Sequence, residues 1–157
     1  MKPAHGHEAQ SQRRRYFSLA WMALLSFVAM YVLMYAMVDK FDNVHSNLNQ
    51  IYMVGLMAMP MVVIELALMR TMYGNKRLNA AIAVACIVAA TVFWFAIREQ
   101  YAISERQFLK SMIPHHAGAI LMCERADLTD QAAIDLCPRI LASQTAEIAE
   151  MESMLGG

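Results

Sequence analysis

The sequence predicts an all-α membrane protein in which three transmembrane helices are followed by an extramembrane helical hairpin. The chain of 157 residues is 59% hydrophobic and only 17% charged, which is more apolar than a small soluble core requires. Its apolar residues gather in three long runs, and the last part of the chain changes to an amphipathic pattern. The formal net charge is zero, which excludes the basic excess typical of nucleic-acid binding.

The first predicted element is a membrane span over residues 16–38. Residues 1–15 are polar and end in three arginines, so we expect them to form a cytoplasmic tail. The apolar run that follows is too long for a signal-peptide core and ends without a small-residue cleavage site, so we expect it to be retained. At about 1.5 Å per residue it reaches about 35 Å, which is enough to cross the hydrocarbon core.

Two further apolar runs, residues 51–69 and 78–97, complete a predicted transmembrane region over residues 16–98. Lysine and arginine cluster before the first span and between the second and third, whereas the first loop has a single lysine. The positive-inside rule therefore places the N-terminus in the cytoplasm and everything after the third span outside. In a bacterium, this predicts an inner-membrane protein in contact with the lipid bilayer, with a periplasmic C-terminal domain in which disulfides persist.

Methionine is unusually frequent, with 15 residues. Within the spans its ordinary role is to fill gaps between helices. An alternative is an accessory copper path near the outer ends of the first two spans, formed by thioethers and one histidine: Met34, Met37, His45, Met53 and Met57. Glu65 also has two open interpretations, either a functional intramembrane acid or a side chain that snorkels to the interface beside Arg70.

Residues 104–157 are predicted to form a helical hairpin. One helix is expected over about residues 104–126, either separate from the third span or continuous with it. Residues 127–130 form the turn, where Thr129 or Asp130 can cap the second helix, which runs to the terminal glycines. A proline falls inside each predicted helix, and we expect it to kink the helix or to mark a fresh start.

The first hairpin helix concentrates sulfur and imidazole donors. Met112 lies three and four residues before His115 and His116, and Met122 and Cys123 continue the same side of the helix. Thioethers and thiolates favour Cu(I), whereas imidazole suits several late transition metals. The spacing predicts a soft-metal site with copper, and Cu(I) in particular, as the favoured ion. The same residues are also compatible with core packing and with a histidine that pairs with a carboxylate.

The second hairpin helix offers a complementary face. Its polar and thioether side chains recur every three or four residues: Gln144, Glu147, Met151 and Met154. A fold at Asp130 sets residue 116 opposite residue 144 and brings Met151 within about one turn of Met112.

Cys123 and Cys137 lie on opposite sides of Asp130 at equal distance, so the hairpin sets them across from each other. A disulfide here would staple a hairpin that is too small to hold itself. The alternative is that Cys123 is an extra thiolate ligand of the metal. Cys86, in the third span, is expected to be a small packing residue.

A string of specific residues near the C-terminus carries a family resemblance. The string F-L-K-S-M-I-P-H-H-A-G-A over residues 108–119, followed by Ser143-Gln144 and the run 147–151, resembles the domain-of-unknown-function 305 family over roughly the last 50 residues. Some relatives are periplasmic copper-binding proteins with a ferritin-like helical arrangement, and others carry three membrane spans ahead of the domain. The resemblance implies a ferritin-like half bundle with these metal ligands: Met112, His115, His116, Met122, Met151 and Met154.

Relatives that carry the hairpin in tandem imply that a single hairpin pairs with a second copy. The simplest assembly is a homodimer in which two hairpins form a four-helix bundle.

Two classes of function follow from the sequence. The first is a copper-binding membrane protein used in tolerance, storage or handover. The second is a structural membrane subunit without metal, whose hairpin docks a partner protein. The first function requires the methionine and histidine side chains to converge on one point, whereas in the second they can scatter over a surface. We do not expect an enzyme, because the sequence has no nucleophile elbow, no H-E-x-x-H and no E-x-x-H pair.

Overall fold

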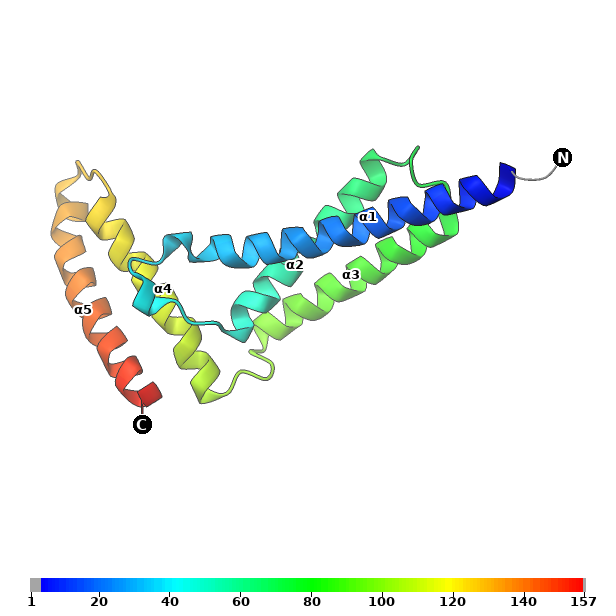
Figure 1. Cartoon of the computed structure of the whole chain (residues 1–157). Helices are drawn as coiled ribbons and strands as arrows, with labels where there is room; N and C mark the ends of the chain where they lie inside the picture. Colours follow the sequence, from blue (N-terminus) through cyan, green and yellow to red (C-terminus); the bar gives the residue numbers. More distant parts are fainter. Residues whose placement is uncertain (1–3, 157) are drawn as a thin grey trace. The chain divides into compact units, whose positions relative to one another are not determined.

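The structure, a computed structural model, describes the backbone of residues 4–156 and the side chains of residues 10–156. It is all-α, as predicted (Figure 1). The described elements are α1 (Ala4–Leu33), η1 (Met34–Met37), η2 (Phe41–Asn43), α2 (Leu48–Leu68), α3 (Lys76–Arg98), α4 (Glu105–Arg125) and α5 (Gln131–Gly156).

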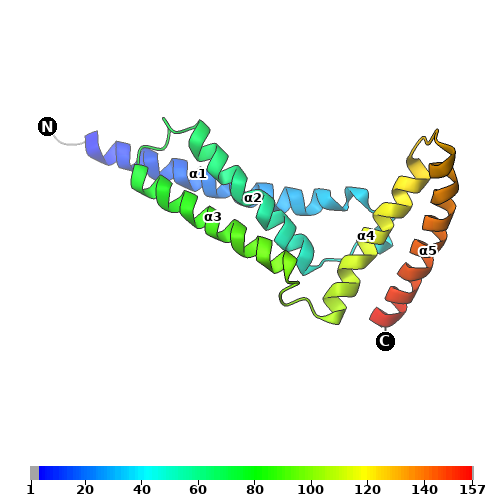
Figure 2. The same ribbon diagram turned by 180° about the vertical axis from the view of Figure 1, so that it is seen from behind.

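These elements form two compact units, which are described separately. The three-helix unit holds the residues up to 31 together with 51–101, and the hairpin unit holds residues 32–50 and 102–157. Both views in Figures 1 and 2 show α4 and α5 running side by side in the hairpin unit.

Three helical segments are long and apolar enough to cross a membrane, in agreement with the three predicted spans. They are Gln10–Met37, Leu48–Leu68 and Lys76–Arg98. The first helix begins well before the predicted residue 16, because the polar residues ahead of the span include good helix formers such as alanine, glutamine and arginine. It ends at Leu33, and the short 3₁₀ helix η1 continues the chain to Met37.

The three-helix unit has a small buried cluster to which all three helices contribute. Its members are Leu19, Val62, Leu66, Tyr73 and Cys86. Large apolar side chains also cover the outside of these helices, including Phe17, Ile64, Val84 and Phe95. Such an outer surface suits lipid, because a helix pairs most of its backbone polar groups internally.

A close approach of two helices in this unit depends on Gly55. A Cβ atom at this position would lie 2.6 Å from the ring of Phe93. The absence of a side chain therefore lets the aromatic ring of α3 rest directly on the backbone of α2, a packing mode common between membrane helices.

Glu65 has a hydroxyl partner. Its carboxylate shares a hydrogen bond with Tyr73, in the loop between α2 and α3. Burial and the nearby Glu65 carboxylate both raise the pKa of Tyr73 above its usual value. Among the described residues no ion pair joins Glu65 to Arg70.

The third span and the first hairpin helix are separate elements. The chain leaves α3 at Arg98 and passes through two residues with left-handed backbone, Gln100 at φ 48° and Ala102 at φ 57°. These conformations end a right-handed helix. Helix α4 then starts afresh, with the Ser104 hydroxyl accepting a hydrogen bond from the Gln107 N–H.

The hairpin unit is built around the antiparallel pair α4 and α5. Asp130 caps α5 by accepting a hydrogen bond from the Ala133 N–H at 3.1 Å, as the turn composition predicted. Pro114 and Pro138 lie inside continuous helices, so neither marks a fresh start. The segment of residues 34–50, including η1 and η2, packs against α4.

Candidate functional site

His116 is held on both sides of its ring. Its Nδ1 lies 2.8 Å from the carbonyl oxygen of Met112, one turn earlier in α4. Because a carbonyl can only accept, Nδ1 carries the proton in this contact. Its Nε2 lies 2.7 Å from a carboxylate oxygen of Glu147 on α5. The ring is therefore fixed in orientation and links the two helices.

Glu147 is oriented by a second contact. Its other carboxylate oxygen accepts a hydrogen bond from the Ser143 hydroxyl at 2.6 Å. The hydrogen bonds from Ser143 and then from His116 lower the pKa of Glu147 below its ordinary value, because both stabilise the charged form. The His116 side chain is 12% exposed and that of Glu147 is 47% exposed, so the pair opens to solvent on the Glu147 side.

Two methionines lie next to this pair, one from each helix. Met151 belongs to the buried cluster of the hairpin, and Met112 packs against the same cluster. Met112 precedes His116 by one turn, and Met151 follows Glu147 by one turn. Because the helices are antiparallel, both methionines lie on the same side of the His116–Glu147 pair along the hairpin. One imidazole and two thioether side chains therefore lie within about one helical turn of each other along the hairpin.

The side-chain partner of His116 differs from the one that the predicted register suggested. We expected residue 116 to face residue 144, but His116 contacts Glu147 instead. Nearer the turn, Cys123 and Cys137 pair at the predicted register. The difference of three residues is within the reach of a histidine and a glutamate side chain, so Met151 remains within about one turn of Met112, as predicted.

Three of the predicted ligands lie outside this group. His115 is exposed, Met122 is 53% exposed, and Met154 is 58% exposed. Met122 follows Met112 by ten residues, which corresponds to about 15 Å along a helix. These side chains lie on the open surface of the hairpin.

Cys123 and Cys137 form a disulfide between α4 and α5, with a Cα–Cα separation of 5.4 Å. In this state Cys123 carries no thiolate, so it is not a metal ligand. The bond links the two helices near the turn, while the His116–Glu147 contact links them farther along. Cys86 is a free, buried thiol in α3.

Pro114 creates an attachment point for the segment that packs on α4. A proline has no N–H, so the carbonyl of Lys110, one turn earlier, loses its usual helical partner. The Asn47 amide donates to that carbonyl at 3.5 Å and to the His45 carbonyl at 3.0 Å. Gln107 supports the same segment by accepting from the Leu48 N–H at 3.0 Å. The proline of the M-I-P-H-H string therefore joins residues 43–50 to α4.

The residues of the predicted accessory path fall into both units. In the hairpin unit, Met34 and Met37 lie in η1, and the Met37 carbonyl lies 3.5 Å from where a Cβ atom of Gly118 would be. His45 has a buried Nε2 atom that finds no hydrogen-bond partner in the part of the chain that the structure describes. In the three-helix unit, Met53 and Met57 lie on the outer surface of α2.

Among residues 10–156, no group of three or more histidine, cysteine, aspartate and glutamate side chains is arranged to hold a metal ion. Met112 and Met151 lie within about one helical turn of His116 and its partner Glu147 along the hairpin.

The family model described as a domain of unknown function, DUF305, matches residues 57–155. The chain belongs to the DUF305 family. The match extends beyond the hairpin and includes part of α2 and all of α3, so it is longer than the stretch that carries the M-I-P-H-H string. The chain is also similar to the uncharacterized protein L153 of Acanthamoeba polyphaga mimivirus, with 34% identity over 137 residues. That alignment covers 85% of this chain and 88% of the viral protein, whereas no solved structure matches.

Sequence reasoning allowed a histidine–carboxylate pair without identifying it as His116 with Glu147, and it missed the attachment of residues 43–50. Ser143 and Glu147 are four residues apart, a spacing at which helical side chains meet, and this was the available signal for an oriented carboxylate. The polar residues just before α2 and in its first turn, which include Asn43, Asn47 and Gln50, were the signal for the attachment of residues 43–50.

Proposed function

We propose that this DUF305 protein binds copper as Cu(I) in the hairpin formed by α4 and α5. The observation that carries the proposal is the placement of His116 between the Met112 carbonyl and Glu147, with Met112 and Met151 in one cluster beside it. One imidazole and two thioethers form a soft ligand set, which favours Cu(I) over harder cations.

Each residue of this group has a distinct part in binding. Met112 and Met151 supply thioether sulfur, and His116 supplies Nε2. The Nδ1–H bond to the Met112 carbonyl fixes the ring and keeps Nε2 as the ligand atom, which is how metal-binding histidines are usually oriented. Glu147, which contacts Nε2 in the structure, would release this nitrogen when it binds the metal.

The proposed role is tolerance, storage or handover, without catalytic turnover. Sulfur-rich ligands hold Cu(I) and disfavour rapid exchange with Cu(II). We place the hairpin on the periplasmic side of a bacterial inner membrane, because the basic residues flank the opposite ends of the spans. The disulfide between Cys123 and Cys137 supports an oxidising compartment.

A homodimer completes the proposed assembly. The open surface of the hairpin carries His115 and several exposed apolar side chains: Phe108, Met122, Leu136 and Met154. Two such surfaces packed against each other would form a four-helix bundle and cover these side chains. Light scattering of the copper-loaded chain in detergent tests this, and a monomer at every concentration would contradict it.

The test of copper binding is a competition titration of the full chain against a chromogenic Cu(I) chelator. The full chain is needed because residues 34–50 are part of the hairpin unit. Met112→Leu and Met151→Leu keep the apolar volume and remove the sulfur, so each should weaken Cu(I) binding at least about tenfold. Met154→Leu is the matched control, because this methionine lies one turn away but is exposed.

Other outcomes of this titration decide against the proposal. Equal Cu(I) affinities of the wild type, Met112→Leu and Met151→Leu would show that the two thioethers are not ligands. Absence of Cu(I) binding in a folded chain would favour the alternative, a structural subunit whose hairpin docks a partner. A readily reversible Cu(II)/Cu(I) couple at the site would also contradict the proposed ligand set.

A further inference from the structure

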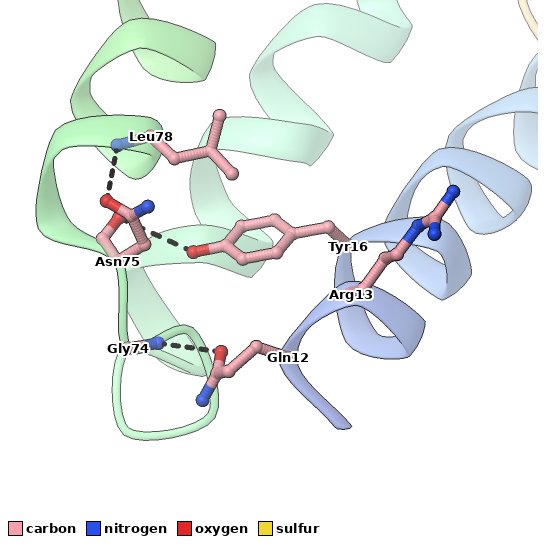
Figure 3. A pocket seen from close by; sticks show the side chains of 6 residues that line it. All are labelled: Gln12, Arg13, Tyr16, Gly74, Asn75 and Leu78. Atoms are coloured by element: carbon pink, nitrogen blue, oxygen red, sulfur yellow. Dashed lines mark hydrogen bonds between the residues drawn. The ribbon is translucent and has the colours of Figure 1, made fainter. Parts of the chain in front are cut away.

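A second candidate site lies in the three-helix unit, at the end where α1 meets the loop between α2 and α3. A pocket of ≈ 610 Å³ is lined there by Gln12, Arg13, Tyr16, Gly74, Asn75 and Leu78. Figure 3 shows Tyr16 extending from α1 toward Asn75, with Gln12 beside Gly74. Arg13 starts near the α1 end of the ring, and its guanidinium extends away from Gln12 and Asn75, so it must turn to meet a ligand between them. The volume lies within the range of small-molecule sites.

The polar groups around this pocket leave donors rather than acceptors available. The Gln12 side-chain oxygen accepts from the Gly74 N–H at 3.2 Å, and the Asn75 side-chain oxygen accepts from the Leu78 N–H at 3.0 Å. The Tyr16 hydroxyl donates to the Asn79 side-chain oxygen at 2.6 Å. The two amide nitrogens and the Arg13 guanidinium have no acceptor among the described residues. A set of free donors fits a ligand that only accepts, such as a phosphate.

The charged residues next to the pocket are basic, which also favours an anionic ligand. Six basic residues lie on the adjoining stretches of chain: Arg13, Arg14, Arg15, Arg70, Lys76 and Arg77. Arg15 donates to the Met72 carbonyl at 2.7 Å, and none of the six forms an ion pair with a described residue. Glu65 is the one acidic residue in the three candidate membrane spans, and it is hydrogen-bonded to Tyr73. This end of the unit is therefore strongly cationic.

The pocket lies where a candidate span changes from polar to apolar. Its α1 residues are near the start of the span Gln10–Met37, and Leu78 is near the start of the span Lys76–Arg98. Farther along α1 and α3 from the pocket, apolar side chains are exposed, including Phe17, Trp21 and Val84. A ligand with an anionic head and an apolar tail would match both parts of this surface.

We propose that this pocket binds the headgroup phosphate of one anionic glycerophospholipid. Arg13 pairs with the phosphate, and the amide groups of Gln12 and Asn75 donate hydrogen bonds to its oxygens. The acyl chains follow the apolar surface that begins at Leu78. This lipid site is independent of copper binding by the hairpin, since none of its residues belongs to the hairpin unit.

The test is native mass spectrometry of the full chain in detergent, titrated with phosphatidylglycerol or phosphatidylcholine. We expect one phosphatidylglycerol to bind at least about tenfold more tightly than phosphatidylcholine, and Arg13→Gln to remove about tenfold of that affinity, the scale of one hydrogen bond to a charged group. Arg14→Gln is the matched control, because it removes the same charge from the neighbouring position without lining the pocket.

Three results would overturn the proposal. Equal losses in Arg13→Gln and Arg14→Gln would mean that only the overall charge attracts the lipid. Equal binding of both lipids would mean that no phosphate site of this kind exists. Displacement of phosphatidylglycerol by millimolar inorganic phosphate would assign the pocket to a soluble anion, whereas retention of the lipid supports the proposed source.

Discussion

The three-helix unit and the hairpin unit bury different sets of side chains. The three-helix unit keeps only a small apolar cluster inside and exposes large apolar residues along its helices. The hairpin unit buries polar side chains as well as apolar ones, and the buried polar residues of the described chain all lie in it: Asn43, Asn47, Gln50 and Ser111. The comparison teaches that helices apolar enough to cross a membrane can have few buried contacts, whereas the hairpin unit depends on specific hydrogen bonds as well as on apolar packing.

The largest expected difference between the units comes from truncating one isoleucine in each. Ile113 is 0% exposed in α4, and Ile87 is 59% exposed in α3. Ile113→Ala should destabilise the hairpin by about 2–5 kcal/mol, whereas Ile87→Ala should change α3 by less than about 0.5 kcal/mol. Hydrogen exchange of peptides from each helix, followed by mass spectrometry in detergent, measures both. Equal losses would show that Ile87 is covered by protein rather than lipid.

Reduction of the disulfide should produce a similar or smaller loss, confined to the hairpin. Cys123 and Cys137 are 14 residues apart, and a loop of this size corresponds to about 3 kcal/mol of stabilisation. With a reductant, exchange in α4 and α5 should accelerate while α3 stays protected. A Cys86→Ala variant should respond to the reductant in the same way, because that thiol is already free. Unchanged protection of the hairpin would mean that the staple is dispensable.

The smallest expected effect comes from one polar contact in the hairpin unit, the hydrogen bond from Asn47 to the Lys110 carbonyl. Asn47→Ala should cost about 1 kcal/mol, because it removes the donor to the Lys110 carbonyl. The loss should shrink in a Pro114→Ala background, where an alanine N–H at that position can restore the helical bond to the same carbonyl. A double-mutant cycle on hairpin exchange measures this coupling. Additive losses would show that Asn47 acts independently of Pro114.

Features fixed by local chemistry could be predicted from the sequence. The three apolar spans follow from composition and length, and Asp130 was recognisable as a helix cap because capping depends on neighbouring backbone groups. The side of α4 that carries Met112 and His116 followed from helical periodicity. These predictions involve residues within a few positions of each other.

Features that depend on contacts between distant residues could not be predicted. The Glu147 contact of His116 depends on the hairpin register, which the turn alone sets only to within a few residues. From the sequence, Pro114 could be interpreted only as a kink or as a fresh helix start. Its role in attachment could not be predicted, because Asn47, the donor to the freed Lys110 carbonyl, lies 63 residues away in the chain. The separation of Met122 and Met154 from the Met112–Met151 pair likewise depends on how the two helices face each other.

The attachment of residues 43–50 to α4 has a consequence for how this hairpin can be reused. The family match begins at residue 57, yet Asn47 and the 3₁₀ segments before it belong to the same structural unit as α4 and α5. A hairpin transplanted onto another scaffold as residues 102–157 alone would leave the Lys110 carbonyl without its donor and expose the surface that Val38 covers. The portable module is thus discontinuous in sequence, and a functional graft must include the residues between the first two spans.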